Sequence, residues 1–373
     1  MDMRAYEVEM IRDGKVKYFF IRNRETMEIE LLPTRFLTHK TRAQESPNTV
    51  GSLARSICYY MNFCDSRQMG FTDVCQMDYE AQFNHFTDFL QWLKAGNHTK
   101  NLKKTPRNRT CNTYLKNVFG FFSFLEMAED QFGSLQVLSY GTMHVANSVG
   151  VKRKLRFRSF AGYLREEERE VRAAEKNEIV TILEACTNCR DQLLILMASE
   201  LGFRIGELLG IDYTKDIDYE NHSVRVCFRD DNANDARAKN AEERKGRLSA
   251  DTYDFLLFYI SEYWDILRRQ NYLFINITGE TEGKPMQVAS VYDMFHRMEK
   301  KTGIKITPHM LRRYFANARW DSGWPLELVS QSLGHRHLDT TTRYLNLMDD
   351  KLKQASTEFY NKHSALYGVQ ELL

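Results

Sequence analysis

The sequence predicts a mainly α-helical protein with a small β-sheet, organised in two domains. Its 373 residues exceed the length that a single hydrophobic core usually serves, and this favours two domains. Apolar residues recur at helical spacing along most of the chain, but this periodicity is lost over residues 134–175. A hydrophobic content of 43% and a charged content of 27% are typical of a globular protein and exclude a disordered or fibrous one.

The first part of the chain predicts a β element followed by a helical domain. Apolar and polar residues alternate on both sides of Asp13-Gly14, a pair typical of a hairpin turn, so we expect a small β element over residues 1–40. Ser46-Pro47 then indicates a helix start. The helical domain, residues 41–150, has predicted helices near residues 47–64, 78–95 and 109–127. We interpret the aromatic stripe of the last helix as core rather than as a platform for stacked bases.

A linker and a second domain follow. Residues 151–174 are predicted to be a linker, because the charge changes sign there and no periodicity continues. The second domain, residues 175–373, has two predicted strands, at residues 222–229 and 273–277. Its predicted helices lie near residues 175–186, 189–200, 204–211, 249–269, 287–302, 308–322 and 325–333. The tail, residues 351–373, is also predicted to be helical.

The sequence favours a reducing, cytoplasmic location. No apolar run approaches the roughly 18 residues that a membrane span needs, so we expect no membrane contact. The first residues lack the apolar stretch and the cleavage site of a signal peptide. Seven cysteines, an odd number, do not suggest a secreted disulfide framework. Cys186 and Cys189 form a lone CxxC pair, which is weak evidence for a zinc or redox site.

Basic residues are concentrated in the first part of the chain, although the whole chain carries a net charge of only +2. Clusters of this density can neutralise phosphates and so favour nucleic-acid binding, while the alternative is a solvated loop or linker. The candidate DNA-binding residues are Lys100, Lys103, Lys104, Arg107 and Arg109 in one cluster, and Lys152, Arg153 and Lys154 in another, which continues through Arg156 and Arg158.

Three short motifs in the second domain contain residues suited to cutting a phosphodiester. They are Gly202-Phe203-Arg204-Ile205-Gly206-Glu207-Leu208, Pro308-His309-Met310-Leu311-Arg312 and Leu333-Gly334-His335, with Tyr344 nine residues after His335. Taken singly, each of these residues is more often structural than catalytic. Their joint presence at these spacings favours catalysis.

The chemistry of phosphodiester cleavage explains why these residue types belong together. Negative charge grows on the non-bridging oxygens in the transition state, and Arg204 and Arg312 can each donate paired hydrogen bonds to them. Tyr344 is the candidate nucleophile, and its phenol, with an ordinary pKa of about 10, must lose a proton during attack. His309 and His335 can take or position that proton, which is help typically worth about 10²–10⁴-fold in rate.

With these motifs the sequence strongly resembles the tyrosine recombinase (phage integrase) family. The resemblance is close over residues 175–350 and looser over the helical domain. The stretch from Cys189 to Gly210 is similar to integrase-type transposases of multi-gene bacterial transposons. The resemblance implies a two-domain DNA clamp, with a core-binding domain and a catalytic domain. It also implies a site-specific recombinase that works through a 3′-phosphotyrosine, for integration or transposition of a mobile element, with no cofactor and no metal.

The resemblance also implies partners and finer roles. Four protomers are expected to assemble on two double-stranded DNA duplexes, with accessory recombination proteins as further partners. Within the site, His309 is expected to do acid–base work and His335 to hydrogen-bond the phosphate. The leaving 5′-oxygen is expected to take its proton from Lys239, with Lys245 as the rival, because the hairpin that carries this lysine is longer than in the family pattern. His337 is interpreted as a bystander.

Other functions stay open at this point. A topoisomerase of type IB would use the same chemistry to relax DNA without assembling two duplexes. A DNA-binding regulator on this fold could lack catalysis altogether, although the intact set of catalytic residue types argues against it. The tail bears on this choice, because Leu352, Ala355, Phe359 and Tyr360 share one apolar helical face that could dock on a neighbouring protomer or on its own domain.

Overall fold

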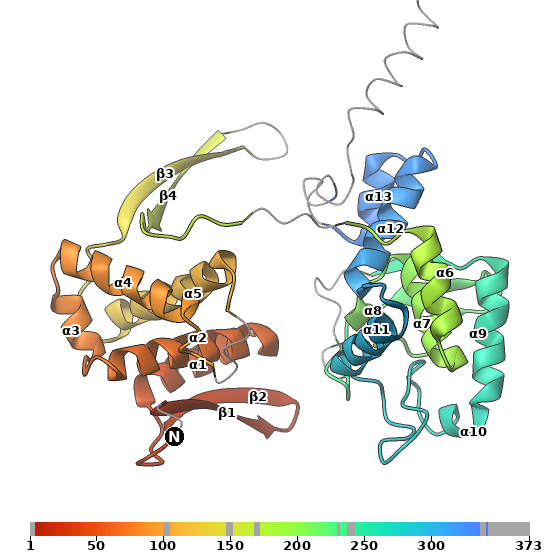
Figure 1. The fold of residues 1–373 in the computed structure, drawn as a ribbon, viewed down its shortest axis with the longest axis horizontal. Coiled ribbons are helices and arrows are strands. Elements are labelled where there is room, and N and C mark those ends of the chain that lie inside the picture. Colours follow the sequence, from red (N-terminus) through yellow and green to blue (C-terminus); the bar gives the residue numbers. More distant parts are fainter. Residues whose placement is uncertain are drawn as a thin grey trace, which may run out of the picture. The chain divides into compact units, whose positions relative to one another are not determined.

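The computed structural model describes residues 4–99, 105–146, 152–167, 172–229, 232–236, 243–335 and 341, with the backbone alone over residues 139–146 and 152–158. The chain divides into two compact units, Met1–Arg169 and Glu170–Leu373 (Figure 1). The division falls inside the predicted linker of residues 151–174. Each unit has a hydrophobic core of its own.

Unit 1 begins with the expected hairpin. Strands β1 (Tyr6–Asp13) and β2 (Val16–Asn23) pair antiparallel. Gly14 makes the turn at φ +56°, a left-handed conformation that costs glycine little. The β element is shorter than expected, because helix α1 (Leu31–Arg42) occupies the end of the segment assigned to it. The hairpin is also no separate element, since it contacts α1 and α2 and places Ile21 in the core of the unit.

The three helices predicted for the helical domain are present. They are α2 (Pro47–Asp65), α4 (Tyr79–Lys94) and α5 (Asn108–Ala128), and a short helix, α3 (Phe71–Gln76), lies between the first two. Ser46 caps α2 by accepting a hydrogen bond from the Thr49 amide. The aromatic stripe of α5 is core, because Phe119, Phe121 and Phe122 are buried and contact aromatic rings of the neighbouring helices.

A second hairpin follows α5, where we expected irregular linker. Strands β3 (Ser139–Ala146) and β4 (Lys152–Ser159) pair antiparallel over their whole length (Figure 1). The sequence does alternate here, with Leu155 and Phe157 between basic residues. The density of positive charge hid this period-two pattern, and the linker interpretation of these residues is wrong for that reason.

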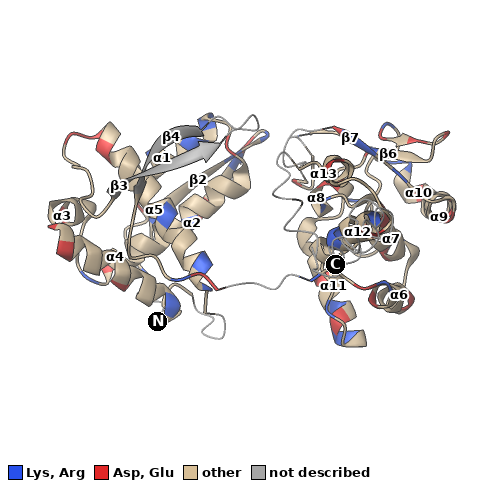
Figure 2. Cartoon of the chain, turned by 90° about the horizontal axis from the view of Figure 1, so that it is seen from above, with Lys and Arg blue, Asp and Glu red and all other residues tan. Residues whose placement is uncertain are grey.

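Unit 2 is built around α7 (Cys189–Leu201), a helix with buried residues on every side that contacts α6 (Lys176–Ala185), α9 (Ala250–Glu262) and α12 (Pro308–Asp321). Its small sheet has the order β5-β6-β7. The strands are Ile217–Asp218, Ser223–Val226 and Arg244–Arg247, and the last is mostly basic (Figure 2). The remaining helices are α8 (Ile205–Leu208), α10 (Trp264–Leu267), α11 (Val288–Thr302) and α13 (Leu326–Leu333).

Two predictions for unit 2 need correction. Residues 273–277 do not form a strand, although Leu273, Phe274 and Ile275 are fully buried. Their apolar run reflects burial, because the segment makes only an isolated bridge, from Ile275 to Pro285. The helix predicted over residues 249–269 is divided into α9 and α10 at Tyr263, whose backbone leaves the helical region.

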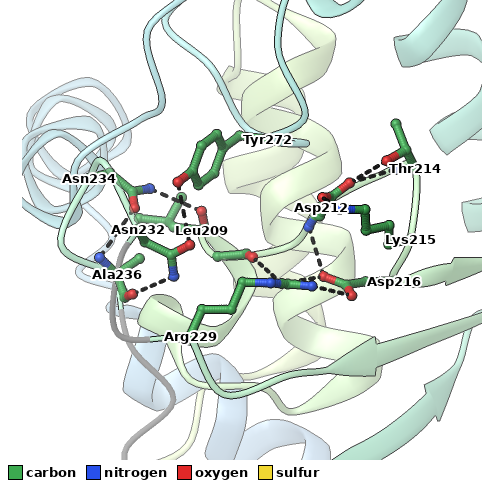
Figure 3. A network of polar contacts seen from close by, with 11 residues as sticks. Leu209, Asp212, Thr214, Lys215, Asp216, Arg229, Asn232, Asn234, Ala236 and Tyr272 are labelled. Carbon is green, nitrogen blue, oxygen red and sulfur yellow. Dashed lines mark hydrogen bonds and ion pairs between the residues drawn. The ribbon is translucent and has the colours of Figure 1, made fainter.

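A polar network fixes the loop that follows β6 (Figure 3). Arg229 donates two hydrogen bonds to Asp216, at 2.6 and 2.7 Å, which ties the loop to the start of the sheet. Buried Asn234 donates to the carbonyl oxygens of Leu209 and Met286 at 3.0 and 2.9 Å. Residues 232–236 are therefore held against the end of α8 and against Met286, which lies shortly before residues 288–302.

The described residues also bear on membrane spans, cysteines and metal sites. None of the described helices is long and apolar enough to cross a membrane. All seven cysteines lie in the described part of the chain and are thiols. Burial raises the pKa of the Cys186 thiol to about 12, and this thiol hydrogen-bonds the Ile182 carbonyl. Among the described residues, no cluster of histidine, cysteine and carboxylate side chains could hold a metal ion.

Candidate active site

Arg204 stands at the start of α8, directly after the end of α7. Gly202 ends α7 at φ +61°, and a Cβ there would lie 2.4 Å from the Phe315 ring, so only glycine fits. This tight turn presents Arg204 as the N-cap of α8. The Arg204 side chain is 26% exposed, so its guanidinium is held at the surface of the unit.

Glu207 is the buried centre of the site, with a side chain only 1% exposed. Its carboxylate accepts from the Arg204 backbone amide at 2.6 Å and from the Arg204 Nη1 at 3.0 Å. It also accepts from both terminal nitrogens of Arg244, and Arg312 Nη1 lies 3.9 Å away. Burial raises the pKa of Glu207, but the hydrogen bonds and charge of Arg244, the Arg204 amide and the charge of Arg312 outweigh it. The pKa stays below its ordinary value, and the carboxylate is ionised.

Arg312, on α12, is held by backbone carbonyls from two other segments. Its Nη1 donates to the Gly202 carbonyl at 2.6 Å, and its Nη2 donates to the Leu333 carbonyl. The side chain is 1% exposed. A guanidinium fixed at both ends of its fork has little freedom left to lose when it binds a phosphate.

His335 follows the end of α13 and contacts Arg312. Its Nε2 lies 3.1 Å from Arg312 Nη2, and its Nδ1 lies 2.9 Å from the Thr341 hydroxyl. Burial, together with the charges of Arg312, Arg204 and Arg244, lowers the pKa of His335 to about 3. The ring is therefore neutral at physiological pH. Because a guanidinium can only donate, Nε2 accepts, and the proton of the neutral ring is on Nδ1.

Arg244, the first residue of β7, joins the hairpin to this cluster. Its side chain is 7% exposed, and its guanidinium lies 4.9 Å from the centre of the Phe203 ring. Gly334, which ends α13 at φ +62°, lets Arg244 approach, since a Cβ there would lie 2.7 Å from Arg244 Nη1. Gly334 thus makes room for Arg244, while the carbonyl of Gly202 holds Arg312.

A surface groove runs beside the cluster. Its walls come from β7 and from α13 with the turn after it, and its lining includes the basic Arg244 and Lys245, the acidic Glu243 and Glu327, and His335. Lys245 is exposed on β7. The strand β7, which forms one wall, is mostly basic (Figure 2). Such a groove can accept a phosphate-bearing ligand next to the arginines.

The structure brings together three of the sequence-predicted catalytic residues, Arg204, Arg312 and His335. His309 is exposed in the first turn of α12, and its charge acts on His335. Tyr344, Lys239 and His337 lie outside the described residues, as do Lys100, Lys103 and Lys104. Of the candidate DNA-binding residues with described side chains, Arg107 and Arg109 are exposed at the start of α5, where Arg109 lies 3.7 Å from Glu166. Lys152, Arg153 and Lys154 lie on β4.

Sequence reasoning missed two residues of the cluster, Glu207 and Arg244. A glutamate three residues after an arginine on a helix is usually a surface pair, and Arg244 lies outside the three motifs of the second domain. The sequence offered one indication of their importance. Glu207 belongs to the motif that precedes the candidate lysine, Lys239, and Arg244 follows that lysine by five residues. Only the tertiary structure shows that the buried carboxylate of Glu207 pairs with three arginines.

Comparison with known proteins agrees with this site. Residues 171–351 match the family model described as the phage integrase family. Transposase A from transposon Tn554 of Staphylococcus aureus is 28% identical over 346 residues, which are 88% of this chain and 90% of that protein. Tyrosine recombinase XerA of Saccharolobus solfataricus is 31% identical over 188 residues, 50% of this chain and 55% of that protein.

Solved structures share the fold. The XerH site-specific recombinase in its post-cleavage complex with a palindromic difH substrate has a TM-score of 0.59 at 18% identity, covering 87% of this chain and 84% of that one. The Tn1549 transposon integrase in complex with transposon right end DNA has a TM-score of 0.58 at 16% identity, covering 88% and 97%. Family match and relatives agree: residues 171–351 are a domain of the phage integrase family, and the protein is a tyrosine-type site-specific DNA recombinase.

Proposed function

We propose that the protein integrates or transposes a mobile DNA element, using Tyr344 as the nucleophile. The observation that carries the proposal is that Arg204 and Arg312 meet at the buried carboxylate of Glu207, while His335 contacts Arg312. The similarity to a transposase along most of both chains supports a role with a mobile element.

The scissile phosphate binds between Arg312 and His335 in this proposal. Arg312 also donates hydrogen bonds to the carbonyls of Gly202 and Leu333, and these bonds fix the guanidinium. Its contact with His335 Nε2 is the one that a phosphate oxygen can take over. Arg204, partly exposed and held by Glu207, supplies the second guanidinium. Donors that are already in place cost no reorganisation when charge grows on the phosphate.

His335 changes its hydrogen-bonding role when the phosphate arrives. In the present arrangement its Nε2 accepts from Arg312 and cannot donate. To donate to a phosphate oxygen, the neutral ring must carry its proton on Nε2, and Nδ1 must then accept from the Thr341 hydroxyl. A hydroxyl can donate or accept, so Thr341 at 2.9 Å supports both tautomers. The His335 ring stays neutral throughout this change of tautomer.

The chemical steps follow from the residue types. The Tyr344 oxygen attacks the phosphorus and gives its proton to His309, while the bond to the 5′-oxygen breaks and Lys239 protonates that oxygen. The products are a 3′-phosphotyrosine and a free 5′-hydroxyl. Attack of a 5′-hydroxyl on the phosphotyrosine reverses these transfers and rejoins the strand. The phosphotyrosine conserves the energy of the phosphodiester, so neither a nucleotide cofactor nor a metal is required.

Duplex DNA is the substrate, and the assembly is a further part of the proposal. Several of the solved relatives are recombinases in complex with DNA. We propose that the two units clamp one duplex and that four protomers bring two duplexes together. The tail of residues 351–373, outside the described residues, docks on a neighbouring protomer. Accessory recombination proteins would act on this assembly.

The experiment that tests the nucleophile uses a nicked suicide substrate, which traps the covalent complex. Tyr344→Phe should abolish the denaturation-resistant protein–DNA adduct and leave DNA binding nearly intact. Tyr360→Phe, a change of the same kind in the tail, should still form the adduct. An adduct formed by Tyr344→Phe and lost in Tyr360→Phe would show that the nucleophile is a different tyrosine.

A second substrate tests the general acid. Lys239→Ala should slow cleavage of normal DNA far more than cleavage of DNA with a 5′-bridging phosphorothiolate, because sulfur leaves without protonation. Lys245→Ala is the matched control on β7. If Lys245→Ala alone shows this substrate dependence, the lysine assignment moves to residue 245.

A further inference from the structure

The β3–β4 hairpin has two chemically different faces. In the antiparallel ladder His144 pairs with Lys154 and Thr142 with Arg156, and alternate positions along each strand share a face. One face therefore carries the basic residues Lys152, Lys154, Arg156 and Arg158. The other face carries Met143, Val145, Leu155 and Phe157, with Arg153 as its single charged residue.

Both ends of the hairpin are fixed in the core of unit 1. Leu138, just before β3, and Phe160, just after β4, are both buried. The Phe160 ring lies 5.4 Å from the rings of Phe83, Phe119 and Tyr163, measured between centroids. Eight paired residues in each strand give an arm about 25 Å long at roughly 3.3 Å per residue. The base of the arm is thus packed in the core of unit 1, and the length of the arm is comparable to the width of a DNA duplex.

The charge of this arm is of one sign. Residues 131–165 contain no aspartate or glutamate and six lysines and arginines. In the described contacts the two strands pair mainly with each other, and neither packs extensively on a helix. A row of four cations without local acidic residues repels itself, and a polyanion removes that repulsion.

We propose that the β3–β4 hairpin is a DNA-binding arm whose Lys152, Lys154, Arg156 and Arg158 face contacts the phosphate backbone of the duplex. This proposal rests on the proposed function, because it takes duplex DNA as the ligand. It also refines the sequence prediction, which grouped Arg153 with Lys152 and Lys154. The register assigns Arg153 to the other face, so its contribution differs from that of its two neighbours.

Neighbouring residues on opposite faces provide the test. Lys154→Gln and Arg153→Gln each remove one positive charge from adjacent positions of β4. Affinity for a duplex site is measured between 50 and 300 mM NaCl, in a Tyr344→Phe background that cannot cleave. Each lost phosphate contact should reduce the slope of log affinity against log salt by about 0.9 and weaken binding about eightfold at 0.1 M salt. Lys154→Gln should show this change and Arg153→Gln a much smaller one.

The double variant Lys154→Gln/Arg156→Gln extends the test. It should reduce the slope by about 1.8, because both positions lie on the basic face. An unchanged salt slope in the Lys154 variants, or equal effects of Lys154→Gln and Arg153→Gln, would overturn the proposal that this face of the hairpin contacts DNA. Thermal unfolding of each variant identifies any loss of fold. The outcome is separate from the proposed function, since cleavage of the suicide substrate at saturating protein depends on Tyr344 and not on the arm.

Discussion

Replacing Glu207 by glutamine tests whether one buried carboxylate organises the arginines. The side chain is 1% exposed and accepts four hydrogen bonds, two from Arg204 and two from Arg244. Glutamine keeps the shape but turns one acceptor oxygen into a donor, which then faces an arginine donor. Breaking a buried ion pair by removing one partner costs about 3–5 kcal/mol, so we expect Glu207→Gln to lose stability of that order.

The assay follows unfolding and cleavage separately. Chemical denaturation is monitored by tryptophan fluorescence, because three of the four tryptophans lie in unit 2. Asp265→Asn is the control, since its pair with Arg268 has exposed fractions of 82% and 55% and should be worth less than about 0.5 kcal/mol. Under conditions where Glu207→Gln is folded, cleavage should be about 100-fold slower, since a shift of about 1 Å in a positioning group costs that much.

A double-mutant cycle separates the pair from general disruption. Arg244→Met removes the guanidinium and keeps an apolar stem beside Phe203. Combined with Glu207→Gln, it should cost about 1–3 kcal/mol less than the sum of the two single variants, because the charge of Arg244 and that of Glu207 are then removed together. Additive costs, or a Glu207→Gln variant with wild-type stability and cleavage, would refute the reasoning.

Three further predictions follow from the structure. Gly202→Ala should lower the free energy of unfolding by about 2–4 kcal/mol, because it adds left-handed strain and overlap with Phe315. Gly303 ends α11 in a left-handed conformation with open space around it, so Gly303→Ala should cost only about 1 kcal/mol in chemical denaturation. Equal costs would contradict the steric argument. Burial lowers the pKa of His85 to about 4, so unfolding binds a proton between pH 6.5 and 4, and stability of unit 1 should fall by up to about 3 kcal/mol as the pH drops through this window. His85→Gln should flatten that dependence in hydrogen exchange of α4, and an unchanged profile would assign it to other groups. Deleting residues from Lys351 onward should reduce strand exchange and higher-order complexes while binding of single protomers survives, and a truncated protein that assembles and recombines normally would exclude docking between protomers.

The sequence by itself predicted most of the helices and the residue types of the candidate site. Helices α2, α4 and α5 were predicted within one or two residues, because their apolar spacing and the Ser46-Pro47 start are local signals. The catalytic residue types were also found from spacing, and the comparisons confirm the family to which those motifs pointed. The roles of Tyr344 and Lys239 stay predictions, since both residues lie outside the described part of the chain.

Only the tertiary structure decided which groups meet. The bonds from Arg312 to Gly202 and from Arg244 to Glu207 join residues 110 and 37 positions apart, and no local pattern encodes such pairs. Burial then decides their meaning, because the same Arg204–Glu207 spacing describes a weak surface pair or a buried centre. The two faces of β4 likewise follow from pairing with β3, since a strand has faces only once its register is fixed.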